Sequence, residues 1–228
     1  MKRLLPLLLA ALFALAIAPA RATDEHDYAK GEYAIIRDGL APDKTKSLAS
    51  HGDGPGGAGN FHVWLMAEPA HRRLAPLVDI EARLDTGPNA YHAFWSADSR
   101  HVAVGFRSDR HIVELNLYQI DGRRARLIVG RSLFKDVTSR DPGSQDDLRT
   151  SFAELKWRGP RRFLLKEHRL FLARDPGFAR SLGAYGKQTD KTDDGRLFFE
   201  FSAEADCLLM SGNRYRIVDL RVGKFGEQ

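Results

Sequence analysis

Apolar and polar residues alternate in short runs between Tyr91 and Gly130, a pattern typical of β-strands. Turn residues separate the runs, and Asp121-Gly122 is the clearest turn because glycine takes a positive φ at little cost. The segment therefore predicts an antiparallel meander of about 40 residues, the size of one propeller blade. Its expected strands are 92–95, 101–106, 111–120 and 124–129.

Part of this pattern recurs twice downstream. Residues 95–104 align without a gap to 201–210, since each segment has an aromatic residue, Ser-Ala, an acid and then an apolar run. Residues 157–165 match at the aromatic residue and at the apolar run, with a Gly-Pro turn between them. We predict that Trp95, Trp157 and Phe201 are equivalent core residues, each at the end of a strand. Each following apolar run would form the next strand, buried on both faces.

A further unit is expected near the N-terminus. Residues 31–36 have the composition of a strand, and residues 61–66 with 72–78 could form a hairpin. Between them, residues 38–60 are rich in glycine and small polar side chains, so we expect a long flexible loop. A phosphate-binding loop is not expected, because the segment lacks a Gly-Lys-Ser/Thr ending and a following helical pattern.

The segment Trp95-Ser96-Ala97-Asp98-Ser99-Arg100 resembles the aromatic-Ser-Pro-Asp-Gly-Lys signature of TolB-like, WD-type β-propeller blades, with Ala97 replacing the usual Pro and Ser99 the usual Gly. The resemblance implies an all-β fold, a β-propeller-like array of about four antiparallel four-stranded blades. Known propellers of this type have more blades than this chain can hold, so an open arc of blades and a β-sandwich are alternatives. Such repeats commonly serve as platforms for protein partners, and less often carry a hydrolase or lyase site.

The N-terminus has the three regions of a signal peptide. Lys2 and Arg3 precede an apolar run from Leu4 to Pro19, and Ala20-Arg21-Ala22 is a small-x-small cleavage pattern. A membrane-spanning helix needs about 20 apolar residues, more than this run contains. We therefore expect residues 1–22 to be removed, leaving no transmembrane segment and a periplasmic or secreted protein. Residues 23–228 would form a single domain.

The charge balance argues against a nucleic-acid-binding protein, and the cysteine content excludes a protein stabilised by an internal disulfide. Removing Lys2, Arg3 and Arg21 leaves 32 Lys+Arg against 30 Asp+Glu, a balance that argues against nucleic-acid binding. Cys207 is the only cysteine, so no intramolecular disulfide can form, and its apolar surroundings in the sequence predict a small buried side chain. Local basic clusters lie in or beside expected turns and are interpreted as solvated strand edges: Arg123, Arg124, Arg126, Arg131, Arg158, Arg161 and Arg162.

Ser132 and Lys135 match the Ser-x-x-Lys motif of penicillin-binding enzymes. However, Ser132 follows a strand-like run instead of opening a clear helix, and the other motifs of those enzymes are incomplete or in the wrong order. We interpret the match as chance.

The histidines suggest a metal site, since imidazole is a common zinc or copper ligand outside the cell. No pair has the spacing of a known metal motif, and the acidic start around His26 is expected to be a solvated terminus. His92, His101 and His111 fall in the best-defined meander. His92 and His101 would be the first ligands to test, because they lie on adjacent expected strands.

No catalytic, cofactor-binding or metal-binding residue is assigned, and no cofactor is expected. The sequence favours an exported β-propeller-like binding protein, a platform for a macromolecular and most simply a protein partner. Two alternatives stay open. One is an extracytoplasmic hydrolase with its site at the blade tops, and the other is a small-ligand or metal-binding protein.

Overall fold

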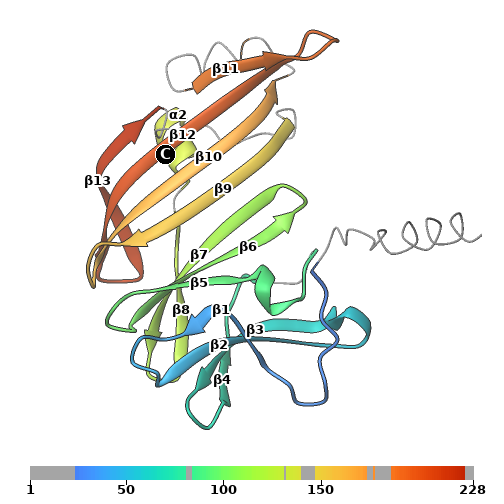
Figure 1. Ribbon diagram of the computed structural model, residues 1–228. Coiled ribbons are helices and arrows are strands. Elements are labelled where there is room, and N and C mark those ends of the chain that lie inside the picture. The colour runs from blue at the N-terminus through green and yellow to red at the C-terminus, as the bar shows by residue number, and fades with distance from the viewer. Residues whose placement is uncertain are drawn as a thin grey trace, which may run out of the picture.

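The computed structural model describes residues 24–80, 84–130, 132–139, 147–173, 177 and 186–223. Within these residues the protein is nearly all β, which confirms the predicted fold class at that level. The strands form one large mixed sheet that is not closed into a ring (Figure 1). No helix in the described part is long and apolar enough to cross a membrane. The predicted signal peptide and Arg131 fall outside these residues.

The predicted meander is present with nearly its expected boundaries. Each strand pairs antiparallel with the next, and Gly122 takes the positive φ that the hairpin turn requires. Val102 and Val104 face one hydrophobic core while Ala103 faces another, so this apolar run is buried on both faces as expected. The strands are β5 (His92–Trp95), β6 (His101–Asp109), β7 (Ile112–Asp121) and β8 (Arg124–Ile128).

The N-terminal unit corrects one expectation. The expected long loop 38–60 contains a complete strand, β2 (Lys46–Asp53), which pairs with β1 (Ala34–Leu40) and β3 (Gly59–Ala67). The small side chains of this segment are buried, with Leu48 and Ala49 fully enclosed. The expected hairpin is formed by β3 and β4 (Arg72–Pro76).

Glycine serves close packing in this segment. A Cβ atom at Gly52 would lie 1.8 Å from the carbonyl oxygen of Gly57, so any larger residue would separate the two backbones. Gly57 lies in η1, a single 3-10 turn at Pro55–Gly57. The composition that suggested flexibility therefore allows two chain segments to approach closely.

The C-terminal group of strands corrects the third repeat. Trp157 ends its strand, as Trp95 does, but Phe201 lies within one continuous strand, β12, that also contains Cys207. The segment after Phe201 has no glycine, proline or residue with positive φ, whereas Ser99 in the true turn has a φ of 57°. The strands are β9 (Asp147–Trp157), β10 (Arg162–Ala173), β11 (Gly186–Lys191), β12 (Leu197–Met210) and β13 (Arg214–Val222).

The antiparallel pairings divide the strands into an N-terminal group (β1–β4), a central group (β5–β8) and a C-terminal group (β9–β13), and two short parallel contacts join these groups. β1 meets β5 at Arg37 and His92, and β7 meets β9 at Ile112 and Ser151. The main strand order is β11-β12-β10-β9-β7-β6-β5-β1-β2-β3-β4, with β13 beside β12 and β8 beside β7.

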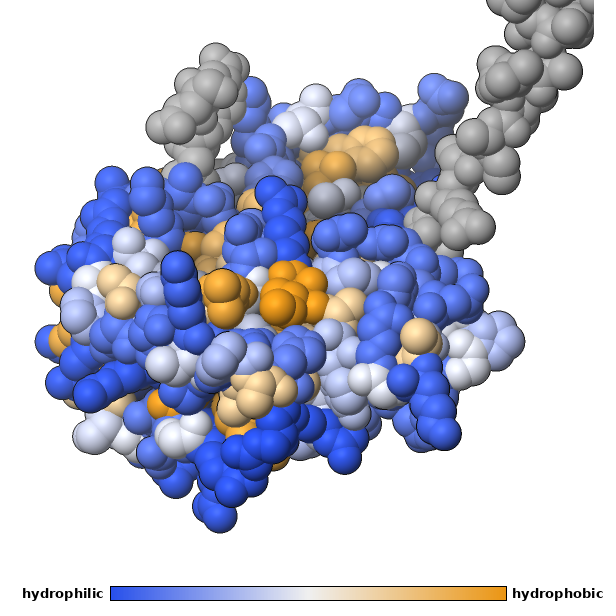
Figure 2. All heavy atoms as spheres, turned by 60° about the horizontal axis from the view of Figure 1, so that its bottom comes forward, coloured by the Kyte–Doolittle hydropathy of each residue, from blue (hydrophilic) through white to orange (hydrophobic). Residues whose placement is uncertain are grey.

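Two hydrophobic cores lie on different sides of this arrangement. The first is formed mainly by the N-terminal and central groups and includes Leu65 and Tyr118. The second lies between the central and C-terminal groups, where α2 (Leu133–Thr138) places Phe134 against Phe201. Cys207 is fully buried in the second core, as predicted. Figure 2 shows that hydrophobic residues reach one outer face only in small groups among hydrophilic ones.

Candidate functional site

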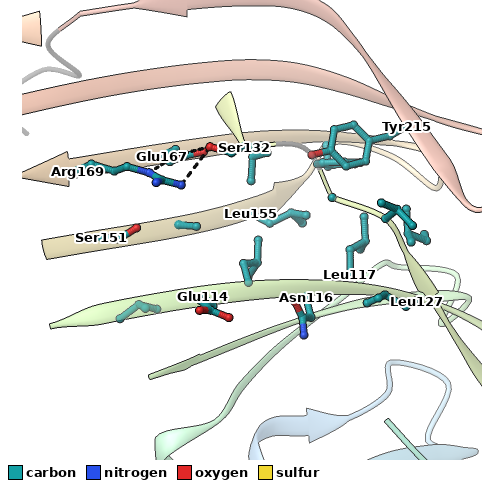
Figure 3. A pocket seen from close by; sticks show the side chains of 18 residues that line it. Glu114, Asn116, Leu117, Leu127, Ser132, Ser151, Leu155, Glu167, Arg169 and Tyr215 are labelled. Carbon is teal, nitrogen blue, oxygen red and sulfur yellow. Dashed lines mark hydrogen bonds and ion pairs between the residues drawn. The ribbon is translucent and has the colours of Figure 1, made fainter. Parts of the chain in front are cut away.

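A cavity of about 290 Å³ opens where β7 and β9 separate. The two strands are paired only at Ile112 and Ser151, beyond which β7 continues with β8 and β9 with β10. Strands that touch at one point and then diverge leave a wedge between them that side chains must fill. We call this space the wedge cavity (Figure 3); its lining includes Leu115, Leu117, Ile128, Val129, Ser132, Ala153, Leu155, Phe163, Leu165, Glu167, Arg169 and Tyr215.

Most of the wedge cavity is apolar because alternate residues of each strand face it. Leu115 and Leu117 come from β7, and Ala153 and Leu155 from β9, each pair two residues apart. Leu117 and Leu155 are buried, whereas Val129 at the end of β8 is 65% exposed. The cavity therefore has an apolar floor and an apolar residue at its opening.

The polar end of the wedge cavity is a cluster of Ser132, Glu167 and Arg169. Arg169 Nε donates to Glu167 Oε1 at 2.5 Å, and its terminal nitrogen donates to Ser132 Oγ at 3.0 Å. Ser132 Oγ donates to Glu167 Oε1 at 3.1 Å, and the backbone N–H of Leu133 donates to Glu167 Oε2 at 2.7 Å. The guanidinium also lies 5.4 Å above the ring of Phe134.

This cluster attaches the start of α2 to β10. Glu167 is only 6% exposed, and a carboxylate in that position requires hydrogen bonds on both oxygens. Ser132 contributes as the N-cap, with its Oγ accepting from the backbone N–H of Lys135 at 3.3 Å. The expectation that Ser132 does not open a helix was wrong, because the carboxylate that completes the cap comes from a strand 35 residues away in the sequence.

The cluster does not have the arrangement of a nucleophilic site. Activation of a serine needs a base free to take its proton. The carboxylate of Glu167 already accepts bonds from Arg169 and from the backbone of Leu133. The geometry is that of a rigid, charge-balanced wall at one end of an apolar cavity.

The structure separates the two histidines named as first metal candidates. His92 pairs with Gly105 at one end of the β5–β6 ladder. His101 lies just beyond the Trp95–Val102 pair, at the other end of that ladder. His92 Nε2 is hydrogen-bonded to Asp38 Oδ2 at 2.7 Å. His101 packs against Trp157, and burial lowers its pKa. The described residues contain no group of three or more His, Cys, Asp or Glu that could hold a metal ion.

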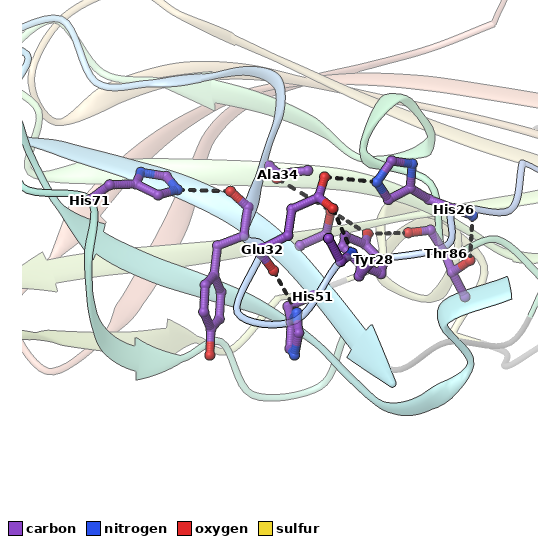
Figure 4. A network of polar contacts seen from close by, with 10 residues as sticks. His26, Tyr28, Glu32, Ala34, His51, His71 and Thr86 are labelled. Atoms are coloured by element: carbon purple, nitrogen blue, oxygen red, sulfur yellow. Dashed lines mark hydrogen bonds and ion pairs between the residues drawn. The ribbon is translucent and has the colours of Figure 1, made fainter. Parts of the chain in front are cut away.

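The side chain of His26 and the backbone of His111 make contacts within the fold. The carbonyl oxygen of His111 accepts from the N–H of Ser151 at 3.1 Å, beside the point where β7 meets β9. His26 Nε2 is bonded to Glu32 Oε1 at 3.0 Å (Figure 4). The three acidic residues of this segment are exposed, as expected, but the segment is also tied to the fold, since the N–H of Asp24 donates to Asp85 at 2.8 Å.

Tyr28 is the centre of this N-terminal network. Its hydroxyl lies 2.5 Å from the carbonyl oxygen of Thr86 and 2.7 Å from Ser50 Oγ. Burial raises the pKa of Tyr28 to about 12, so the hydroxyl keeps its proton at neutral pH. Nearby, His51 Nδ1 is bonded to the carbonyl oxygen of Glu32 at 2.5 Å. These bonds attach the start of the described chain to β2.

No family model, curated protein or solved structure matches this chain. The wedge cavity itself was missed by sequence reasoning. One signal was available: the polar run Lys166-Glu167-His168-Arg169 interrupts an apolar strand, and Glu167 and Arg169, two residues apart, share one face of it. Charged residues that face one side of a buried strand must be paired, and paired buried charges often line a cavity or a site.

Proposed function

We propose that this chain is an exported, β-propeller-like binding protein, and that its wedge cavity receives an apolar side chain of a macromolecular partner. The observation that carries the proposal is the character of the cavity. Most of its lining is apolar, its buried charged cluster is internally paired, and exposed Val129 stands at its opening, while the exposed side chain of Glu114 also borders it. Pockets with apolar walls and a few fixed polar groups are typical of binding sites.

The volume favours a side chain over a large ligand. About 290 Å³ is at the lower end of the range of about 300–1,000 Å³ for small-molecule sites. An anchor residue of a partner needs only a pocket of its own size surrounded by further contacts. A second opening shares Val129 and Tyr215 with the wedge cavity and is bordered by exposed Met210, so the apolar surface continues beyond the cavity.

Two further parts of the proposal rest on the sequence and the fold. Two antiparallel meanders with a tryptophan at the same strand end support a propeller-like relationship between the groups. The signal-like N-terminus supports export, and mass spectrometry of the exported protein should then find Thr23 as the first residue.

Site-specific crosslinking tests the cavity. We expect benzoylphenylalanine at position 129, introduced into the exported full-length protein, to give one defined adduct in cells. Ala153→Phe fills the wedge cavity from β9 and should abolish that adduct without changing export or thermal stability. Val218, which is 48% exposed on β13 and does not line the cavity, is the matched control for the crosslinker position.

The outcomes distinguish the two binding hypotheses. A Val129 adduct that persists in the Ala153→Phe variant would contradict the proposal, as would equal adducts from positions 129 and 218. The neutral dye N-phenyl-1-naphthylamine tests the small-ligand alternative. Saturable dye binding that Ala153→Phe removes, together with no protein adduct, would replace the macromolecular partner with a small apolar ligand.

A further inference from the structure

Three hairpin turns from two groups of strands meet at one end of the sheet. The N–H of Ile120, just before the β7–β8 turn, donates to the carbonyl oxygen of Arg100 in the β5–β6 turn at 2.7 Å. Trp157, just before the β9–β10 turn, packs against His101 with ring centres 5.9 Å apart. The β5–β6 and β9–β10 turns both lie on the left side of Figure 1.

These turns are strongly basic. Segments 96–101, 119–126 and 157–162 together contain seven arginines and two aspartates. We call this surface the arginine-rich end, and all seven arginines are exposed: Arg100, Arg123, Arg124, Arg126, Arg158, Arg161 and Arg162. The two basic clusters seen in the sequence are therefore neighbours in the fold, and both Arg100 and Arg161 act on His101 to lower its pKa.

Only part of this charge is neutralised within the molecule. Arg162 forms a two-pronged ion pair with Asp206, and Arg126 lies 3.3 Å from Asp121. Arg161 donates to the carbonyl oxygen of Leu209 at 2.8 Å, which holds its side chain in place without cancelling its charge. Among the described residues, no acidic side chain is within ion-pair distance of the other four: Arg100, Arg123, Arg124 and Arg158.

We infer that the arginine-rich end binds an acidic segment of the macromolecular partner. Guanidinium groups form paired hydrogen bonds with carboxylates, and several held on one rigid surface favour an anion with several charges. Charge complementarity of this kind accelerates association and selects the partner. The inference rests on the proposed function for the existence of a partner, and it concerns a surface separate from the wedge cavity.

The charge of the rest of the molecule favours a compact protein anion over a membrane or a nucleic acid. Residues 23–228 contain 32 Lys+Arg and 30 Asp+Glu. With the seven arginines and two aspartates assigned to one end, the remainder holds more acidic than basic side chains. A long polyanion or a planar anionic membrane would extend beyond the arginine-rich end and meet this acidic remainder, whereas an acidic peptide segment would not.

The test uses a fluorescein-labelled peptide of 12 glutamates and the full-length exported protein. We expect saturable binding by fluorescence anisotropy, weakening as salt is raised, and at least tenfold weaker binding to the triple variant Arg100→Gln, Arg123→Gln and Arg158→Gln. The control variant Lys30→Gln, Arg110→Gln and Lys191→Gln removes the same number of positive charges at exposed positions away from this end. It should change the affinity less than twofold.

Three results would overturn the inference. The first two are no binding of the glutamate peptide and equal binding of that peptide by the two triple variants. The third is that phosphatidylglycerol vesicles or a 12-base-pair DNA duplex bind more tightly than the peptide and lose as much affinity in the arginine triple variant. Thermal melting of each variant checks the fold, and the substituted side chains are exposed, so unfolding is not expected. A failed Ala153→Phe crosslinking test with a positive peptide result would remove the cavity and keep the charged surface.

Discussion

The indole Nε1 of Trp157 donates a hydrogen bond to the carbonyl oxygen of Phe94 at 2.8 Å, joining β9 to β5 across 63 residues of sequence. Trp95 makes the corresponding bond one group earlier, with its Nε1 donating to the carbonyl oxygen of Gly39 at 3.0 Å. Each tryptophan therefore ends a strand and holds the preceding group of strands. The two tryptophans thus have the same role at positions that the sequence pattern aligns.

The contribution of the Trp157 hydrogen bond to stability can be measured separately from the contribution of its indole ring. We expect Trp157→Ala to lower the free energy of unfolding by about 3–5 kcal/mol, as the loss of a large aromatic side chain does. Trp157→Phe keeps most of the packing and should cost about 1 kcal/mol for the lost hydrogen bond. Urea denaturation followed by circular dichroism measures both values.

The matched control is Trp64→Phe. Trp64 Nε1 is buried and has no hydrogen-bond partner among the described residues, so this change removes no hydrogen bond, and it keeps an aromatic ring beneath Arg73. A larger loss for Trp64→Phe than for Trp157→Phe would show that the indole bond of Trp157 does not stabilise the fold.

Gly57 should tolerate no side chain. It has a φ of +64°, and a Cβ atom there would lie 2.5 Å from the carbonyl oxygen of His26. We expect Gly57→Ala to lower the free energy of unfolding by at least about 2 kcal/mol, since backbone strain and overpacking act together. Gly122 has a similar φ of +55° with no atom within 4 Å of its Cβ position. Gly122→Ala should therefore cost only about 1 kcal/mol, and equal thermal shifts for the two variants would contradict the contact with His26.

The Arg107–Asp85 pair should be the most sensitive ion pair in the N-terminal half. Arg107 Nε donates to Asp85 Oδ2 at 2.7 Å, and Asp85 is 3% exposed. Arg107→Met leaves a buried carboxylate without its cation, so we expect the free energy of unfolding to fall by about 2–4 kcal/mol. This is somewhat less than for a fully buried pair, because Arg107 is partly exposed. Arg126→Met breaks an ion pair with Asp121 in which both side chains are at least half exposed, and it should cost much less in the same denaturation experiment.

The His71–Glu68 pair predicts a pH-dependent contribution to stability. The hydrogen bond that His71 donates to the carboxylate of Glu68 raises the pKa of His71 above 6.5. Burial of Glu68 acts to raise its pKa, but hydrogen bonds from Ser47 and His71 outweigh burial and hold it below 4.5. The histidine contribution is complete below about pH 6.5 and is lost as the pH rises through the folded pKa, while the carboxylate contribution is complete above about pH 4.5 and is lost as the pH falls.

We therefore expect His71→Gln to destabilise the protein more at pH 5.5 than at pH 8.5, by a difference under about 1 kcal/mol for a partly exposed pair. His101→Gln should show the opposite trend. Burial lowers the pKa of His101, so the parent protein loses stability as the pH falls below about 6.5 and the variant does not. Parallel pH profiles for the two variants would contradict the assignment of these shifts.

Local patterns in the sequence were sufficient for several features of this protein. The alternation of residues 91–130 and the Asp121-Gly122 turn predicted four strands that the structure contains. The apolar surroundings of Cys207 predicted its burial. These features depend on neighbours within a few residues, since side-chain alternation and turn conformation are properties of the local backbone.

Only the tertiary structure decided the course of β2 and β12, the separation of β7 from β9, and the meeting of three basic turns. The Gly-rich segment became a strand because Leu48 and Ala49 find partners on β3, and the segment after Phe201 stayed extended because β10 and β13 pair with it. The wedge cavity follows from a single pairing between Ile112 and Ser151. Such pairings join residues far apart in the chain. Their free energy depends on packing and loop closure, which the sequence of a short segment does not determine.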